Sequence, residues 1–342
     1  MPRPTVQDIA VAAGVSVATV DRVLNGRAGV RPETILKVNE AVERLNYVRN
    51  VDAANLAKRR TYPILFIVPE GPNAFMRALE AEIRSAVLRE PLERTEIEVV
   101  TVPAFNERAI LKVLDGVDPA RLAGVVLVAT DSVALRRRVD DLAEAGVAVV
   151  TLVSDLPNSR RAHFAGIDNV SAGRTAASLL GRFLDGRDGA VAVVAGSMVV
   201  RDHVERRLGF EQVMRSEYPS LQLLPTIEGL DEATRVEELL GAQLQRNPDT
   251  VGVYSLGAGN RGVGAALTSA GLAGKVRVVA HELTRFSREA LANGLFDAII
   301  SQDPGHEVRS AIRVIKAQRD GVPVVGSQER IRIEIFLRDN LP

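Results

Sequence analysis

The spacing of hydrophobic residues changes near residue 60. Before that point apolar positions recur at helical spacing, as in Ile35, Val38, Val42 and Leu45. After it, strand-length apolar runs such as 124–129 and 190–195 alternate with amphipathic stretches. This alternation is typical of parallel sheets with crossover helices, and it occurs in two successive series. The pattern predicts an all-α head followed by a two-lobed α/β core with two parallel, doubly wound sheets.

The head carries the start and stop signals of three short helices. Thr5 can cap the first helix, and Gly14 can end it because glycine accepts a positive φ. Ser16 can cap a second helix from residue 17 to about 24, and Pro32 suits the first turn of a third. A capped second helix after a tight glycine turn is the helix-turn-helix arrangement.

The second helix would present one face to DNA. Val17, Ala18 and Arg22 face outward, while Val20 and Val23 pack inward. The Arg22 guanidinium can donate two hydrogen bonds to guanine, and the small apolar side chains of Val17 and Ala18 favour contact with a thymine methyl group. Polar residues placed for phosphate contacts complete this prediction: Thr5, Ser16, Thr19 and Asn25.

Charge supports the division into a head and a body. Residues 1–60 hold ten Lys/Arg and six Asp/Glu, a net charge of +4, whereas the rest of the chain carries −4. A basic head on an acidic body is expected if only the head meets phosphates. The sequence has no cysteine, no signal-peptide pattern and no apolar run of membrane length. We therefore expect a cytoplasmic protein with no membrane partner.

Polar residues follow most of the expected strands of the body. In open α/β sheets, ligands bind beyond the carboxyl ends of strands, so these residues are candidates for a small-molecule site. They are Asn73, Asn106, Asp131, Asp155, Asn260, Glu282 and Gln302.

The head resembles that of the lactose-repressor family. The stretches that carry the resemblance are 8–10, 13–16, 19–20, 22–26 and 45–47, followed by Asn50, Ala53 and 56–57. The resemblance implies that Arg22 reads a base and that Val17 and Ala18 set specificity. It also implies that residues 50–58 form a hinge helix only on DNA, with Asn50, Ala53 and Leu56 at the duplex and Leu56 as a minor-groove wedge. Asp21 departs from the family's usual serine, which puts a phosphate contact there in doubt.

Residues 62–340 resemble the sugar-sensing core of the same family, which is similar to periplasmic sugar-binding proteins. The matching stretches are 151–155, 166–169, 173–174, 206–210 and 302–303. The resemblance implies a sugar or polyol effector bound between the lobes. It implies ligand contacts from Arg206, Glu282 and Gln302 in the second lobe and at the hinge. It implies first-lobe contacts from Asn73, Phe75, Asn106 and Asp131. Asp155 and Asn260 are also expected at the effector site.

The predicted domain boundaries follow from these segments. Residues 1–48 form the DNA-binding head, 49–61 the hinge, and 62–342 the effector-binding and dimerisation core. Within the core, the first lobe comprises about 62–166 and 301–325, and the second about 167–300 and 326–342.

The sequence favours a homodimeric regulator of a near-palindromic operator on double-stranded DNA. Repression and a dimer are preferred to activation and a tetramer. A transport-type solute receptor is one alternative. A second is an NAD-dependent enzyme, because 257–262 reads as a glycine fingerprint with Glu282 about twenty residues on. No catalytic constellation or metal-ligand histidine spacing accompanies that motif, so we expect no enzyme, cofactor or metal.

Overall fold

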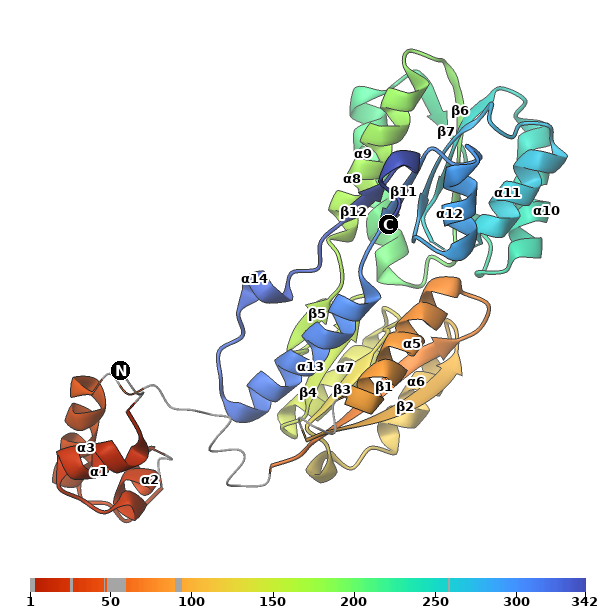
Figure 1. Cartoon of the computed structure of the whole chain (residues 1–342). Helices are drawn as coiled ribbons and strands as arrows, with labels where there is room; N and C mark the ends of the chain where they lie inside the picture. The colour runs from red at the N-terminus through yellow and green to blue at the C-terminus, as the bar shows by residue number, and fades with distance from the viewer. Residues whose placement is uncertain (1–3, 25–26, 46, 48–59, 90–93, 258) are drawn as a thin grey trace. The chain divides into compact units, whose positions relative to one another are not determined.

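The computed structural model describes residues 4–24, 27–45, 47, 60–89, 94–257 and 259–342. The chain divides into two compact units, Met1–Arg60 and Thr61–Pro342 (Figure 1). Within the described residues, no helix combines the length and apolarity that crossing a membrane requires.

The first unit contains three helices, α1 (Val6–Ala13), α2 (Val17–Leu24) and α3 (Pro32–Arg44), around a small core that includes Ile9, Val20 and Val38. Thr5 and Asp8 form a reciprocal capping box at the start of α1, and Gly14 ends it with φ 65°. Ser16 Oγ accepts from the Thr19 backbone N–H at 3.1 Å and so caps α2. The helix-turn-helix predicted from these signals is confirmed.

The first lobe of the second unit is a five-stranded parallel sheet in the order β2-β1-β3-β4-β5. Its elements are β1 (Tyr62–Glu70), α5 (Ala74–Arg89), β2 (Thr95–Pro103), α6 (Glu107–Asp115), η2 (Pro119–Arg121), β3 (Gly124–Leu127), α7 (Val133–Glu144), β4 (Ala148–Leu152) and β5 (His163–Ala165). Apolar side chains cover both faces of the sheet, which is why its strands read as nearly continuous hydrophobic runs.

The second lobe has a sheet in the order β12-β11-β10-β9-β6-β7, with β8 also paired to β6 and only β12 antiparallel among the described strands. Its elements are α8 (Asn169–Leu184), β6 (Gly189–Ala195), α9 (Arg201–Glu217), β7 (Leu221–Leu223), β8 (Ile227–Glu228), α10 (Ala233–Arg246), β9 (Thr250–Ser255), α11 (Asn260–Ser269), β10 (Arg277–His281), α12 (Arg285–Ala292), β11 (Ala298–Ser301), β12 (Glu334–Phe336) and η3 (Arg338–Asn340). Two apolar clusters again pack on opposite faces.

The chain passes between the lobes three times. It leaves the first lobe after β5, returns after β11 into α13 (Pro304–Asp320), and leaves again after α14 (Gly326–Glu329). In Figure 1 the blue helix α13 lies against the orange and yellow elements of the first lobe, and it packs on α5 and β4. Glu329 forms an ion pair with Arg313 of α13 at 2.7 Å, which ties α14 to that helix.

Helices α8 and α9 cross with their backbones in direct contact. A Cβ atom on Gly173 would lie 1.9 Å from the Arg206 carbonyl oxygen, and one on Gly209 would lie 2.0 Å from the Val170 carbonyl oxygen. Only glycine fits both positions. The crossing fixes α9, and therefore Arg206, against the start of α8.

We expect Gly173→Ala to lower the free energy of unfolding by about 1–3 kcal/mol, because the new methyl group forces α8 and α9 apart. The matched control is Gly241→Ala in α10, where an added Cβ meets nothing within 4 Å. That change should leave stability equal or raise it by up to about 1 kcal/mol, since alanine favours a helix. Urea denaturation measures both; equal effects of the two variants would contradict the close crossing.

Candidate functional site

The second helix of the helical unit presents the predicted DNA-reading side chains to solvent. Val17, Ala18 and Arg22 are exposed, whereas Val20 is fully buried. Among the described residues, none forms an ion pair with Arg22. This face therefore combines a small apolar surface with an available guanidinium.

Asp21, next to Arg22, forms an ion pair with Arg27 at 3.4 Å, and both side chains are at least half exposed. An exposed pair of this kind contributes little and is screened by salt.

The predicted phosphate contacts are engaged at helix starts. Thr5 takes part in the capping box of α1, and the Ser16 and Thr19 hydroxyls are 2.8 Å apart at the start of α2. Helix N-termini attract phosphates, so this placement is compatible with the predicted role. The remaining predicted DNA contacts lie outside the described residues: Asn25, Asn50, Ala53 and Leu56.

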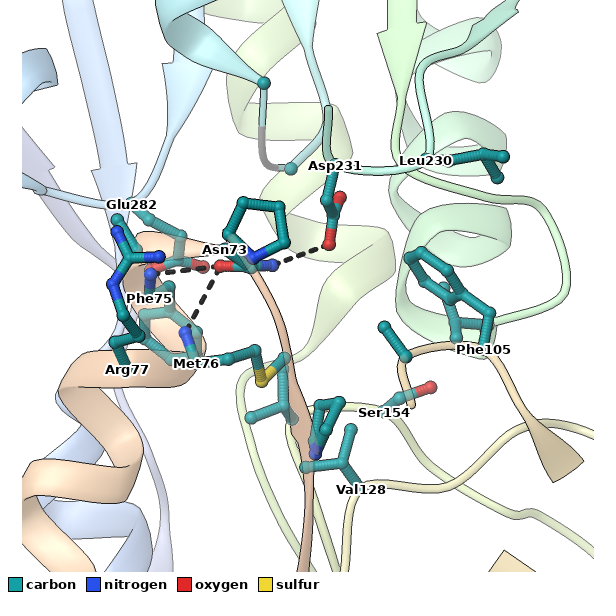
Figure 2. A pocket seen from close by; sticks show the side chains of 18 of the residues that line it. Asn73, Phe75, Met76, Arg77, Phe105, Val128, Ser154, Leu230, Asp231 and Glu282 are labelled. Carbon is teal, nitrogen blue, oxygen red and sulfur yellow. Dashed lines mark hydrogen bonds between the residues drawn. The ribbon is translucent and has the colours of Figure 1, made fainter. Parts of the chain in front are cut away.

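A cavity of about 450 Å³ lies between the two lobes, where the strands of both sheets end. Figure 2 shows Met76 and Val128 on its lower side and Asp231 and Leu230 on its upper side. The predicted site residues that line it are Asn73, Phe75, Arg206, Asn260 and Glu282. Gln302 lies behind Glu282 and donates from Nε2 to Glu282 Oε1 at 2.8 Å.

Arg206 is the central charge of the cavity, and its side chain is almost fully buried. Its Nε donates to Asn169 Oδ1 and its Nη1 to the Leu256 carbonyl oxygen, both at 2.8 Å. Its Nη2 lies 3.6 Å from Glu282 Oε1. Burial raises the pKa of Glu282 to about 7, and Arg206 and the hydrogen bond from Gln302 oppose that rise.

Several buried polar atoms at the cavity lack a hydrogen-bond partner. In the second lobe these are Asp202 Oδ1, Arg206 Nη2, Asp231 Oδ1, His281 Nδ1 and Glu282 Oε2; in the first lobe there is Thr130 Oγ1. Leaving such atoms unpaired is costly, and native proteins normally satisfy them with protein, water or ligand. The set can therefore bind a molecule that both donates and accepts hydrogen bonds, as hydroxyl groups do.

A hydrogen bond joins the two lobes across the cavity. Asn73 Nδ2 donates to Asp231 Oδ2 at 2.8 Å, and Asn73 Oδ1 accepts from the first turn of α5 (Figure 2). Burial raises the pKa of Asp231, against the effects of His203 and Asn73. Sequence reasoning missed Asp231, Asp202 and His203. Asp231 follows a strand too short to detect, and the other two lie on the first turn of α9 rather than at a strand end.

Backbone strain is concentrated at the cavity. Eight non-glycine residues of the described chain have a positive φ, and five of these line the cavity: Phe105, Val153, Leu230, Asp231 and Glu282. Apolar residues rarely adopt this conformation, and strain of this kind collects at functional sites. The strand ends are therefore held in positions that packing alone would not favour.

Besides Gln302, three further predicted contacts lie outside the cavity lining. Asn106 caps α6 by accepting from the Ala109 N–H at 3.0 Å. Asp131 pairs with Arg136 and lies 3.7 Å from Arg201. Asp155 is paired with Arg161, and its pKa is lowered because Arg161 and hydrogen bonds outweigh the effect of burial. Their oxygens are thus engaged by the protein itself.

The last glycine of the supposed fingerprint, Gly262, lies within α11 and serves helix packing. A Cβ on Gly262 would lie 2.1 Å from the Ala233 carbonyl oxygen, so this glycine lets α10 and α11 approach. Asn260 accepts from Ser255 Oγ at 2.8 Å and donates to the His281 carbonyl oxygen at 2.9 Å, which ties β9 to β10. Glu282, the acid of the supposed fingerprint, faces Arg206 and Gln302. Among the described residues, no cluster of three His, Asp or Glu is placed to hold a metal ion.

Fold and cavity together define the class of protein: a helix-turn-helix unit attached to a two-lobed α/β core with an interlobe pocket. Residues 64–322 match the family described as "Periplasmic binding protein domain", and residues 5–50 match "Bacterial regulatory proteins, lacI family". The chain belongs to the periplasmic binding protein domain family, with the N-terminal domain of the lacI family of bacterial regulatory proteins.

Curated relatives match the N-terminal region. Catabolite control protein A of Staphylococcus epidermidis is 47% identical over 75 residues, which is 22% of this chain and 23% of that protein. The same protein of Staphylococcus xylosus is 45% identical over the same length. The alignment thus spans about a quarter of these relatives.

Solved structures resemble the core. GanP, a glucose-galactose binding protein from Geobacillus stearothermophilus, has a TM-score of 0.74 at 20% identity and covers 83% of this chain and 99% of its own. A solute binding protein from Agrobacterium vitis bound with alpha-D-tagatopyranose has a TM-score of 0.72 at 22% identity, with 82% and 96% covered. These similarities confirm the predicted fold of the core.

We expect Glu282→Gln to flatten the pH dependence of stability. The folded-state pKa of about 7 exceeds the ordinary 4.5, so the native protein loses stability as pH rises through that window and Glu282 ionises. The glutamine variant lacks this loss, and its stability relative to the native chain should rise between pH 4.5 and about 7. Urea denaturation across that range checks it, with exposed Glu289→Gln as control. A constant difference would contradict a buried, ionising Glu282.

Proposed function

We propose that this protein is a sequence-specific DNA-binding transcription regulator whose operator affinity depends on a small sugar or polyol bound between the lobes. The observation that carries the proposal is the combination of an exposed reading face on α2 with an interlobe cavity of unpaired buried polar atoms. The lacI-family match of residues 5–50 supports DNA as the partner. Repression in the cytoplasm is the mode we propose.

The DNA-binding step depends on α2. Val17 and Ala18 present methyl groups suited to thymine, and Arg22 presents a fork of donors suited to guanine. Thr5, Ser16 and Thr19 lie at helix starts, where phosphates bind favourably. The function of Leu56 as a minor-groove wedge remains part of the proposal.

The protein is proposed to act as a homodimer on a near-palindromic operator, because two heads on a two-fold axis read half-sites about one helical turn apart. Analytical ultracentrifugation of the free chain should give twice the mass of the 342-residue monomer. A monomer that binds a single half-site would contradict this part of the proposal.

The small molecule is proposed to bind Asn73, Phe75, Arg206, Asp231 and Glu282. Asn73 and Asp231 already bridge the lobes, so a ligand that contacts both stabilises one relative position of the lobes. The effect of the ligand on operator affinity cannot exceed the difference in its affinity for the two conformations.

Two other functions are weaker candidates. A transport receptor does not account for the helix-turn-helix unit, and the glycine loop does not support NAD binding.

We expect Arg22→Ala to lower the ratio of operator to scrambled-DNA affinity by about tenfold, equivalent to about 1.4 kcal/mol, because a base contact is lost. Lys37→Ala removes one charge from the same unit and serves as the matched control, because Lys37 lies on α3. It should change both affinities together. Fluorescence anisotropy against DNA upstream of the gene measures the ratio, and an unchanged ratio for Arg22→Ala would argue against base reading.

We expect Asp231→Asn to weaken ligand binding by about tenfold, because a buried carboxylate acceptor is replaced by an amide. The sugar or polyol that raises the melting temperature most in a thermal-shift panel is the probe. At a concentration equal to the Kd of the native chain, this probe should change operator affinity to a similar extent for the native chain and for the exposed control Asp141→Asn, and much less for Asp231→Asn, whose site is then mostly empty. Equal responses of all three would contradict effector binding at this cavity.

A further inference from the structure

The two walls of the cavity differ sharply in chemistry. Among the described residues, five of the buried side-chain polar atoms at the cavity that lack a hydrogen-bond partner belong to the second lobe, and one, Thr130 Oγ1, belongs to the first. The atoms that would form hydrogen bonds with a ligand are therefore concentrated on the second-lobe wall. A fully hydroxylated ring would present hydroxyl groups to both walls.

The first-lobe wall is mostly apolar. It is lined by Phe75, Met76, Val102, Phe105, Ile110, Val128 and Val153, with prolines and alanines between them. Its polar groups are largely engaged or peripheral. Asn73 bonds Asp231 and α5, the Ser154 hydroxyl accepts from the Arg201 N–H at 3.0 Å, and Glu70 and Arg77 are exposed.

The backbone holds this apolar surface at the cavity. Phe105 and Val153 follow β2 and β4 with φ of 59° and 60°, and Leu230 in the second lobe has φ 51°. A β-branched or large apolar residue in this conformation is an outlier. Figure 2 shows Leu230 and Phe105 at the cavity, away from the Asn73–Asp231 bridge.

We propose that the ligand is amphipathic, with a hydroxyl-bearing end at the second lobe and an apolar end at the first, as in a deoxy sugar or an aryl glycoside. This inference rests on the proposed function and narrows its ligand class. A hydroxyl group directed at Val128 or Phe105 would lose its hydrogen bonds to water without gaining others. A methyl or phenyl group there gains buried apolar contact.

Matched pairs of probes test the proposal on the full chain: D-galactose with D-fucose, L-mannose with L-rhamnose, and D-glucose with phenyl β-D-glucoside. Calorimetry and thermal shift at millimolar concentration are expected to give about tenfold tighter binding for the deoxy or phenyl member of at least one pair. The ligand class is overturned if, in every pair that binds, the fully hydroxylated sugar binds as tightly as its partner or more tightly. It is also overturned if none of the six sugars binds. Operator binding is measured in parallel. If the chain binds its operator but the ligand class is wrong, the proposed DNA regulation is still supported. If the chain does not bind its operator, the proposed function itself is wrong.

A variant of Phe105 tests the wall itself. Phe105→Asn removes the ring while asparagine tolerates the positive φ, so folding should persist, which the melting temperature of the unliganded variant checks. This variant is expected to bind the preferred deoxy or phenyl probe about tenfold more weakly. The ratio between the affinities of the two sugars in that matched pair should also fall. Leu88 is exposed and lies outside the cavity, so Leu88→Asn is the matched control. It should leave the affinity for the probe and the affinity ratio within the pair unchanged. The proposal would be overturned if folded Phe105→Asn bound the probe with unchanged affinity and kept the affinity ratio within the matched pair.

Discussion

The second lobe is organised around a guanidinium that the fold buries. A buried charge is tolerated only when it is paired and hydrogen-bonded, and Arg206 meets this condition through Asn169, the Leu256 carbonyl oxygen and Glu282. Those partners come from α8, the end of β9 and the end of β10, so one side chain holds three strand or helix ends in place. The close crossing of α8 and α9 at Gly173 positions Arg206 beside these three partners.

The same region contains carboxyl groups whose charge the fold opposes. Burial raises the pKa of Glu282 to about 7 and that of Glu307, with a further contribution from Glu282, well above its ordinary value. Glu307 lies in the first turn of α13, just after the chain crosses between the lobes, and both of its carboxyl oxygens lack a hydrogen-bond partner. The lobe junction therefore carries a concentration of uncompensated polar atoms that a well-packed core would avoid.

The helical unit was predictable nearly in full, because its signals are local. The Thr5 cap, the Gly14 stop and the Ser16 cap each act within a few residues, and all three are confirmed. Most long strands and helices of the core were likewise visible in their hydrophobic periods, but helix α13 was not among the predicted elements. Short strands such as β5, β8 and β12 were also missed, because two or three residues are too few to show a period.

For the cavity, the sequence by itself determined the residue types at strand ends, and with them that polar groups such as Glu282 would gather at one edge of each sheet. Only the tertiary structure decided which of them reach the cavity. Asp131 and Asp155 are paired with neighbouring arginines, whereas Asp202 and Asp231 reach the cavity with unpaired oxygens. The physical reason is that a carboxylate's availability depends on which cation the fold brings within a few ångströms, and that distance is set by contacts between segments remote in the chain.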